Sequence, residues 1–191
     1  MGRLQHRTSP GFTYFVTTKT WQSCAIFQVP RNADILMDRL LHYRDSGSYS
    51  LHEFVVMPNH VHLLLTPSEG TSLEKAVQLI KGGSSHAIHE QSDSKMQIWQ
   101  AGFHEESVRD LADFQRKLKY IHENPVRAHL VQNAAHWQFG SAARKFQLDG
   151  PPERLKICSS GAKAPSFSHS GMSELKLRPP KNLPLPRKMP I

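Results

Sequence analysis

Apolar residues recur with two different periods along residues 12–147, and these periods predict a series of strands and helices. Runs of β-branched and aromatic residues predict strands, and apolar residues spaced by three and four predict amphipathic helices. The predicted strands are residues 12–18, 50–57, 60–66 and 96–103. The predicted helices run from Asn32 to about Ser46, from Thr71 through a weak point or kink at Gly82-Gly83, and from about Ser107 to Asn124.

Turn and cap residues support these boundaries. Pro58-Asn59 lies between two apolar runs and predicts a tight hairpin. Thr71-Ser-Leu-Glu74 matches a capping box and predicts the start of a helix. The bond between Asn124 and Pro125 predicts the end of the third helix, because the residue before proline disfavours helical geometry. Residues 137–147 are expected to add one or two helical turns.

The order of these elements is β-α-β-β-α-β followed by a helix. This order predicts an α+β fold of the split βαβ, ferredoxin-like type, in which two helices cover one face of a four-stranded antiparallel sheet. The opposite face remains available for a ligand or for the last helix.

Charge separates a folded region from a tail. The formal net charge of the 191 residues is +8; residues 1–150 hold 16 Lys and Arg against 14 Asp and Glu, and residues 151–191 hold 8 against 2. We therefore expect a domain over residues 1–149 and a basic, proline-rich, mobile tail over residues 150–191. A basic tail favours an anionic partner, most simply nucleic acid.

Cysteine usage and hydropathy favour the cytoplasm. Cys24 and Cys158 are far apart, so there is neither a zinc-ribbon pair nor a disulfide framework. No apolar run approaches the length of a membrane span, and the first residues lack the apolar core of a signal peptide. A cytoplasmic protein without membrane contact is expected.

Two histidines interrupt the apolar run Val-Val-Met-Pro-Asn-His-Val-His-Leu-Leu-Leu at residues 55–65. Since side chains alternate along a strand, His60 and His62 are predicted to project from the same face. Two neutral imidazoles in this arrangement could share a metal ion, and a third ligand would have to come from elsewhere in the chain. The alternative is a pair of structural histidines.

The third helix carries a polar strip beside its apolar stripe. Tyr120 and Asn124 lie four residues apart on one side of the helix, and Lys117 lies one turn earlier. These three residues could lie over the sheet, although a boundary tyrosine and a helix-ending asparagine are common in ordinary helices.

Three spaced motifs resemble a known family. Met57-Pro-Asn-His-Val-His-Leu-Leu, Trp99-Gln-Ala-Gly-Phe103 and Tyr120-Ile-His-Glu-Asn-Pro-Val-Arg-Ala128 are similar to motifs of the HUH-type single-tyrosine transposases, and most similar to those of the REP-associated tyrosine transposases. The resemblance covers roughly residues 10–147 and implies a ferredoxin-like or RRM-like palm, with the tyrosine on the C-terminal helix.

The resemblance implies a role for each matching residue. His60 and His62 would be metal ligands, Asn124 the third ligand, and Tyr120 the nucleophile. The implied cofactor is a divalent ion, Mg²⁺ or Mn²⁺, which would neutralise charge on the phosphate oxygens.

The implied activity is that of a metal-dependent endonuclease and strand transferase for single-stranded DNA, acting through a covalent 5′-phosphotyrosine. The expected partner is single-stranded or hairpin DNA, the expected state a monomer or homodimer, and the expected location the nucleoid. Lys81, Lys117 and Arg127 are candidate DNA contacts. The alternative is a non-catalytic RRM-like binder of single-stranded nucleic acid, stacking bases on Tyr14 and Phe54.

Overall fold

Four antiparallel strands form the central sheet of the computed structural model, which describes residues 11–92, 95–143 and 145–157. The strands are β1 (Tyr14–Lys19), β2 (Tyr49–Met57), β3 (His60–Pro67) and β4 (His104–Ser107). Their order across the sheet is β2-β3-β1-β4, so β2 and β4 are the edge strands. The predicted α+β class, the antiparallel sheet and the hairpin at Pro58-Asn59 are confirmed.

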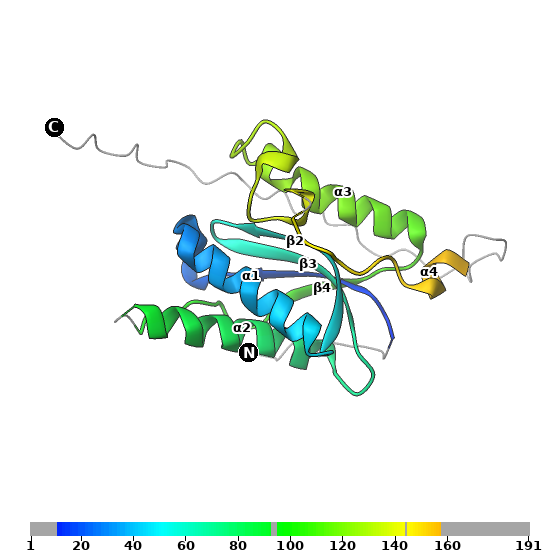
Figure 1. The fold of residues 1–191 in the computed structure, drawn as a ribbon, viewed down its shortest axis with the longest axis horizontal. Helices are drawn as coiled ribbons and strands as arrows, with labels where there is room; N and C mark the ends of the chain where they lie inside the picture. Colours follow the sequence, from blue (N-terminus) through cyan, green and yellow to red (C-terminus); the bar gives the residue numbers. More distant parts are fainter. Residues whose placement is uncertain (1–10, 93–94, 144, 158–191) are drawn as a thin grey trace.

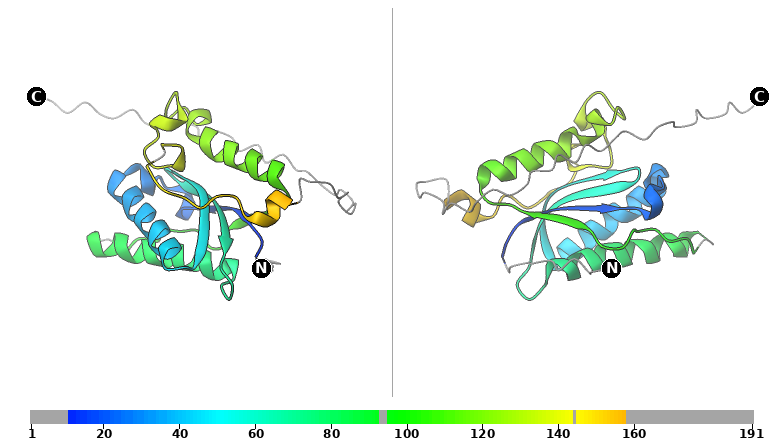
Figure 2. Two further views of the ribbon diagram at one scale, coloured as in Figure 1. Left: turned by 45° about the vertical axis from the view of Figure 1, so that its right-hand side comes forward. Right: turned by 180° about the vertical axis from the view of Figure 1, so that it is seen from behind.

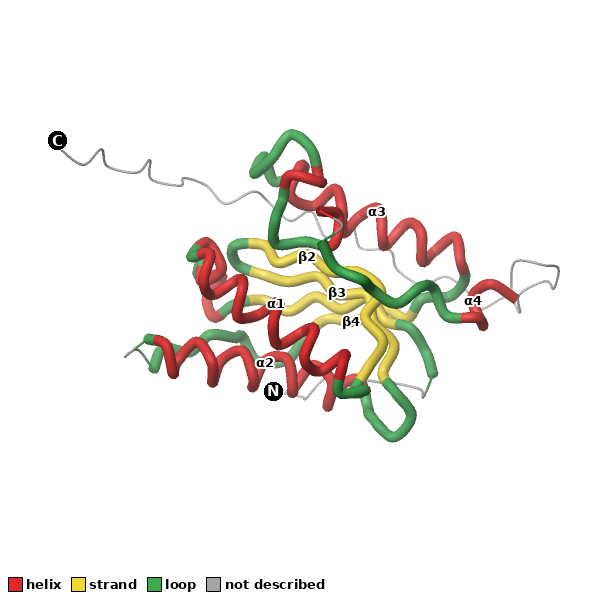
Figure 3. The backbone as a smooth tube through the Cα atoms, viewed as in Figure 1, coloured by secondary structure: helices red, strands yellow, loops and turns green. Residues whose placement is uncertain are grey.

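Helices cover both faces of this sheet (Figures 1 and 3). Helices α1 (Pro30–Asp45) and α2 (Leu73–Gln91) lie on one face, and α3 (Leu111–Arg127) lies on the other, as the two further views in Figure 2 also show. The shorter elements are η1 (Trp21–Ser23), η2 (Ile26–Gln28), η3 (Ala134–His136), η4 (Ser141–Ala143) and α4 (Glu153–Ile157). The last helix predicted from the sequence therefore covers the face that the ferredoxin-like arrangement leaves free.

Period two in the strands divides the buried side chains between two clusters. Val16 and Leu63 belong to the larger cluster, beneath α1 and α2. Phe15 and Leu64, one residue away in the same strands, belong to the smaller cluster with Phe114 and Ile121 of α3. The odd positions of β1 and the even positions of β3 thus face α3, and this face carries the two histidines.

The fourth strand was predicted in the wrong place. Residues 96–103 are irregular apart from an isolated bridge at Trp99, and the paired strand is the polar segment His104–Ser107. The apolar signal at 96–103 comes from packing: Trp99 is buried against Phe27 with ring centroids 5.1 Å apart. The true strand is polar because it lies at an edge of the sheet and faces solvent over most of its surface.

The glycine pair does not interrupt the second helix, contrary to the expected kink. Helix α2 continues through Gly82 and Gly83 to Gln91. A Cβ atom at Gly83 would overlap the hydroxyl of Tyr43 on α1, so glycine there allows the two helices to approach closely.

The starts of α1 and α2 differ from the prediction by a few residues. The N-cap of α2 is Ser72, whose hydroxyl accepts a hydrogen bond from the backbone of Lys75, and not Thr71. Asn32 lies inside α1, where its amide donates to the carbonyl of Ile26.

Asp110 caps α3 by accepting from the backbone of Asp113 at 2.7 Å, so the helix begins at Leu111 and the predicted start near Ser107, which is the last residue of β4, was wrong. The helix ends at Arg127 and contains Pro125, so the predicted end at Asn124 was wrong. Pro125 lies in the last turn, where it removes a single intrahelical hydrogen bond. The turn expected within residues 137–147 is the 3₁₀ segment Ser141–Ala143.

The packed part of the chain extends past the predicted boundary at residue 149. Leu155 of α4 is 2% exposed and joins the cluster beneath α3. Asp149 is itself tied to the domain by the guanidinium of Arg44. The rest of the predicted tail, residues 158–191, lies outside the described residues. None of the helices in the described part of the chain has the length and apolar character that spanning a membrane requires.

Candidate active site

The two histidines of β3 project side by side beneath α3. His60 begins the strand and His62 follows two residues later, with ring centroids 4.8 Å apart. In the β1–β3 ladder, Lys19 is opposite His60 and Thr17 is opposite His62. The arrangement predicted from alternation is therefore present in the structure.

His62 is buried, and only one of its ring nitrogens has a partner. Its Nδ1 lies 2.9 Å from Oγ1 of Thr17, and its ring stacks on Phe15 with centroids 5.3 Å apart. Its Nε2 is buried and has no hydrogen-bond partner among the described residues. When Nδ1 carries the proton and donates to Thr17, the lone pair of Nε2 is left directed into the site.

His60 lies beside two asparagines from different elements. Its Nδ1 donates to Oδ1 of Asn59 in the hairpin turn at 2.7 Å. The side chain of Asn124, on α3, is close enough to the same imidazole to act on its pKa. The β3 strand and the tyrosine helix thus meet at the site.

Burial keeps both imidazoles neutral. It lowers the pKa of His60 to about 4, an effect to which the charge of Lys19 adds and which the neighbouring amide of Asn124 opposes. Burial also holds the pKa of His62 well below its usual value, with smaller contributions from His60 and Lys19. A neutral imidazole is the form that binds metal ions. The lowered pKa values make it the form present at neutral pH.

Tyr120 of α3 lies against this pair. Its ring centroid is 5.2 Å from that of His62, with the planes at 78°, and 5.7 Å from that of Phe15. The guanidinium carbon of Arg127 lies 5.5 Å from the centre of the tyrosine ring. The phenol that the resemblance assigns as nucleophile thus lies beside the histidines assigned as ligands.

The donor set fits a divalent ion if the third ligand is an amide. The described residues contain no cluster of three His, Cys, Asp or Glu side chains suited to a metal. The atoms present are ring nitrogens of His60 and His62 and the side-chain oxygen of Asn124. The unpartnered Nε2 of His62 supports this assignment, because a buried polar atom without a partner costs free energy that a bound ion would offset.

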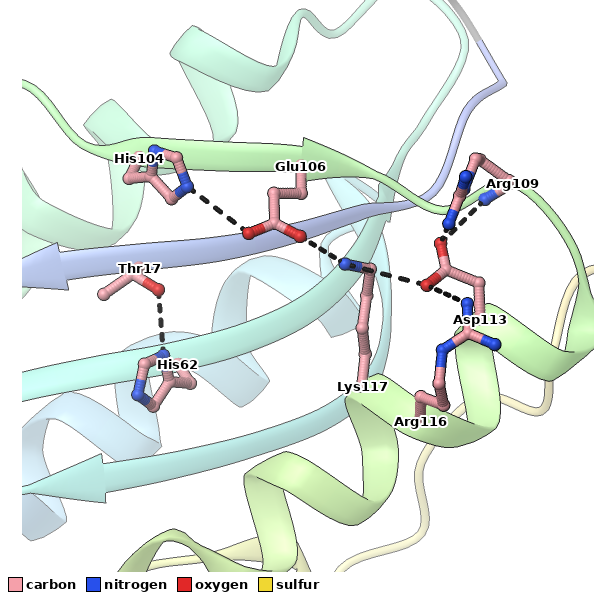
Figure 4. A network of polar contacts seen from close by, with 8 residues as sticks. All are labelled: Thr17, His62, His104, Glu106, Arg109, Asp113, Arg116 and Lys117. Carbon is pink, nitrogen blue, oxygen red and sulfur yellow. Dashed lines mark hydrogen bonds and ion pairs between the residues drawn. The ribbon is translucent and has the colours of Figure 1, made fainter. Parts of the chain in front are cut away.

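Lys117 lies within a network of acidic and basic side chains next to the site (Figure 4). Its ammonium is 2.6 Å from Glu106 of β4, 3.9 Å from Asp113 and 5.2 Å from the centre of the Phe15 ring. Burial acts to raise the pKa of Glu106, but the hydrogen bonds and charges of Lys117 and His104 together outweigh it and lower that pKa. Lys117 is therefore near the site but already paired.

The other two predicted DNA contacts lie in different places. Arg127 is exposed and adjoins Tyr120. Lys81 belongs to α2, on the opposite face of the sheet, where its ammonium donates to the carbonyls of Gln100 and Gly102. The structure therefore brings Arg127 to the site and leaves Lys81 away from it.

Three residues of β1 contribute to the site but were not among the predicted residues. Phe15, Thr17 and Lys19 face α3 and lie beside β3. Their alternation indicated a common face, but nothing local indicated that this face adjoins the histidines.

The aromatic residues invoked for an RRM-like binder are not available for stacking. Tyr14 and Phe54 are 3% and 0% exposed and belong to the cluster beneath α1 and α2. Helix α3 lies over the opposite face. Since neither aromatic side chain can meet a base, that alternative loses its binding surface.

Comparisons with known proteins agree with this fold. A REP-associated tyrosine transposase of Escherichia coli (strain K12) is 28% identical over 119 residues, which are 62% of this chain and 66% of that protein. The solved structure of a REP-associated tyrosine transposase bound to a REP hairpin has a TM-score of 0.64 and 20% identity, covering 87% of this chain and 100% of that one, and this likeness is one of fold. The sequence model described as "Transposase IS200 like" matches residues 29–124, a stretch that contains both histidines, Tyr120 and Asn124. The chain belongs to the IS200-like transposase family.

Proposed function

We propose that this protein cleaves and rejoins single-stranded DNA beside a hairpin, with Tyr120 as the nucleophile and with His60, His62 and Asn124 as ligands of a divalent ion such as Mg²⁺ or Mn²⁺. The observation that carries the proposal is the buried, unpartnered Nε2 of His62 within a site that Tyr120 adjoins. A structural histidine at this depth would be expected to satisfy both of its ring nitrogens.

The reaction requires two exchanges at one phosphorus atom. In cleavage, the phenolic oxygen of Tyr120 bonds to the scissile phosphorus, the bond from phosphorus to the 3′-oxygen breaks, the phenol loses its proton, and the 3′-oxygen gains one. In rejoining, a 3′-OH attacks the phosphotyrosine and Tyr120 recovers its proton. The bond energy is conserved in the covalent intermediate, so no nucleotide cofactor is needed.

Each protein group has a distinct task in this scheme. A bound divalent ion would act as a Lewis acid on the phosphate oxygens. Thr17 and Asn59 hold the Nδ1 atoms of the two histidines, which fixes the orientation of both rings. Packing against Phe15 and His62 holds the ring of Tyr120, so that its oxygen is positioned before DNA binds.

The proposed substrate follows from the relatives and from charge. The similar solved structure is described as bound to a REP hairpin, and we extend this substrate class to the present chain. The basic residues of 158–191 would add phosphate contacts. Tyr120 lies against the histidines of its own chain, and we propose on this ground that a single subunit forms the site. Activity on chromosomal DNA would locate the protein at the nucleoid.

A covalent-adduct experiment tests the proposal. The protein is incubated with Mn²⁺ and a 3′-end-labelled single-stranded oligonucleotide carrying a palindromic repeat from around the gene, and is then denatured. We expect label on the wild-type protein, mapped to Tyr120, and none with chelator. Tyr120→Phe should abolish cleavage and adduct together, while Tyr43→Phe, which removes a hydroxyl on the opposite face of the sheet, should retain both. An adduct on Tyr120→Phe would contradict the mechanism.

A further inference from the structure

Lys19 is the last residue of β1 and is directly opposite His60 in the antiparallel ladder. Directly paired residues of an antiparallel sheet have Cβ atoms about 4.5–5.5 Å apart. Phe15 and Thr17, at the preceding odd positions, contact Tyr120 and His62, so Lys19 continues a row that faces α3. Its side chain begins at the rim of the candidate metal site.

The backbone beside Lys19 is fixed to the turn that precedes His60. The next residue, Thr20, donates its backbone N–H and its hydroxyl to the carbonyl of Asn59, at 3.0 and 2.9 Å. On the other side, the carbonyl of Lys19 accepts from the backbone of Gln100 at 3.0 Å. The position of Lys19 relative to His60 is therefore set by main-chain hydrogen bonds, and the flexible part is its four-carbon side chain.

Lys19 differs from Lys117 and Lys81 in that its ammonium has neither an ion-pair nor a hydrogen-bond partner among the described residues. Lys117 is paired with Glu106, and Lys81 with two carbonyls. Lys19 is exposed, yet its charge acts on both histidines and opposes their protonation. A free ammonium group is thus within electrostatic range of the pair.

A cation in this position would be unfavourable if the site held a metal ion alone. Like charges repel, so Lys19 raises the free energy of binding a divalent ion to His60 and His62. A phosphate that contacts both the ion and the ammonium reverses the sign of this effect, because each cation then interacts with an anion between them. The positive charges of Lys19 and a bound ion are therefore more favourable together when a DNA phosphate is bound than when it is absent.

We propose that Lys19 binds a non-bridging oxygen of the DNA phosphate that occupies the active site. The substrate of this contact is the single-stranded DNA of the proposed function, on which the inference rests. Lys19 is then a substrate-binding residue that couples the metal and the phosphate, and its charge favours the complex of all three components over metal binding alone.

The test compares Lys19→Gln with Lys19→Arg, and uses Lys75→Gln as the control because Lys75 is an exposed lysine on α2, across the sheet. The probe is a synthetic DNA hairpin with single-stranded extensions, bound in chelator and followed by fluorescence anisotropy over a range of salt. Lys19→Gln should bind about tenfold more weakly, as expected for one charged contact. Its plot of log affinity against log salt should be shallower by about 0.7–0.9, as expected for one phosphate contact. Lys19→Arg should retain most of the DNA affinity and most of the salt slope, and Lys75→Gln should match wild type in both quantities.

Metal binding to the free protein separates a phosphate contact from damage to the site. Calorimetric titration with Mn²⁺ alone should show equal or tighter binding by Lys19→Gln, since a repelling charge is gone. Weaker Mn²⁺ binding would mean that Lys19 supports the site structurally, and unchanged DNA affinity and salt slope would mean that it touches no phosphate; either result overturns the inference. If wild type forms no Tyr120 adduct but Lys19→Gln still loses its phosphate contact, the proposed chemistry fails and the contact stands.

Discussion

Glu53 and Glu106 occupy the same cross-strand row at opposite edges of the sheet, and each accepts a hydrogen bond from a side chain of α3. The row runs from Glu106 on β4 through Phe15 and Leu64 to Glu53 on β2. Glu106 pairs with Lys117 at 2.6 Å, and Glu53 pairs with His122 at 2.9 Å.

Tyr120 lies between those two partners along the helix. The apolar centre of the row packs beneath α3, and the two hydrogen bonds fix the helix at both edges of the sheet. The tyrosine is thereby held over the histidines by contacts that do not involve the histidines themselves.

Replacing Glu106 with Gln should affect cleavage and DNA binding in opposite directions. The side chain of Lys117 is only 12% exposed, and it would keep just the distant Asp113 as an acidic partner. We expect cleavage to fall about tenfold as α3 loses one lateral contact, with a stability loss of about 1 kcal/mol. DNA affinity at low salt should rise, because the substitution removes a negative charge near the active site, where the DNA phosphate is proposed to bind.

The matched control is Glu123→Gln, which removes a carboxylate from the exposed pair with Lys119 on the same helix. Single-turnover cleavage and anisotropy titrations measure the two quantities separately. Equal losses in both variants would show that the pair with Lys117 has no particular role in positioning the tyrosine.

Local geometry explains what the sequence could predict about this site. Alternation alone indicated that His60 and His62 share a face, because the direction of a strand side chain depends only on its own strand. That Lys19 is opposite His60 depends on the pairing of segments forty residues apart, which no local pattern records. The strand misplaced at residues 96–103 has the same origin, since burial there comes from packing beneath the helices and the hydrogen-bonded residues 104–107 are polar.

Thr17→Val should weaken metal binding while the domain stays folded. The substitution keeps a β-branched residue in β1 but removes the one hydrogen-bond partner that His62 Nδ1 has within the described part of the chain. Loss of such a partner lowers the metal affinity of a histidine site by about 10–100-fold. Isothermal titration with Mn²⁺ measures the affinity, and thermal melting checks the fold.

The same substitution at the adjacent Thr18 should have a different effect on metal binding and on stability. Its hydroxyl is buried and has no hydrogen-bond partner among the described residues, and it points away from the histidines. Thr18→Val should leave Mn²⁺ affinity unchanged and raise the free energy of unfolding by about 1 kcal/mol. If both valine variants lose metal to the same degree, the hydrogen bond from Thr17 is not what orients His62.

Asp149 should make the stability of the domain depend on acid pH. Its carboxylate accepts from Nε and Nη2 of Arg44 and from the backbone of Leu51. The hydrogen bond with Arg44 is the largest effect on the pKa of Asp149 and, against the opposing effect of burial, holds it below its usual value. A carboxyl group with a lowered pKa stabilises the fold fully above its unfolded pKa of about 4, and this contribution is lost as the pH falls through the folded value.

Asp149→Asn should therefore reduce the free energy of unfolding by about 1–3 kcal/mol at pH 7, and the difference from wild type should shrink below about pH 4. Urea unfolding at pH 7 and pH 3 measures this difference in the free energy of unfolding. Asp45→Asn is the control, since Asp45 also contacts Arg44 but its side chain is 66% exposed, and its loss should cost little. A difference between Asp149→Asn and wild type that is as large at pH 3 as at pH 7 would rule out the ionised carboxylate as its source.

Asn124→Ala should produce a defect that added metal partly corrects, unlike the loss of the nucleophile. The amide side chain lies beside His60 and is the proposed third ligand, so its removal takes one donor from the ion. With His60 and His62 still present, the ion binds more weakly but in the same place, and a higher Mn²⁺ concentration refills the site. Cleavage measured against Mn²⁺ should show a midpoint raised about 10–100-fold. Tyr120→Phe should stay inactive at every Mn²⁺ concentration, because metal cannot replace the attacking oxygen. Asn133→Ala, which removes the cap of η3, should retain the wild-type midpoint. An unchanged midpoint in Asn124→Ala would exclude this residue as a ligand and leave the third position to be found elsewhere.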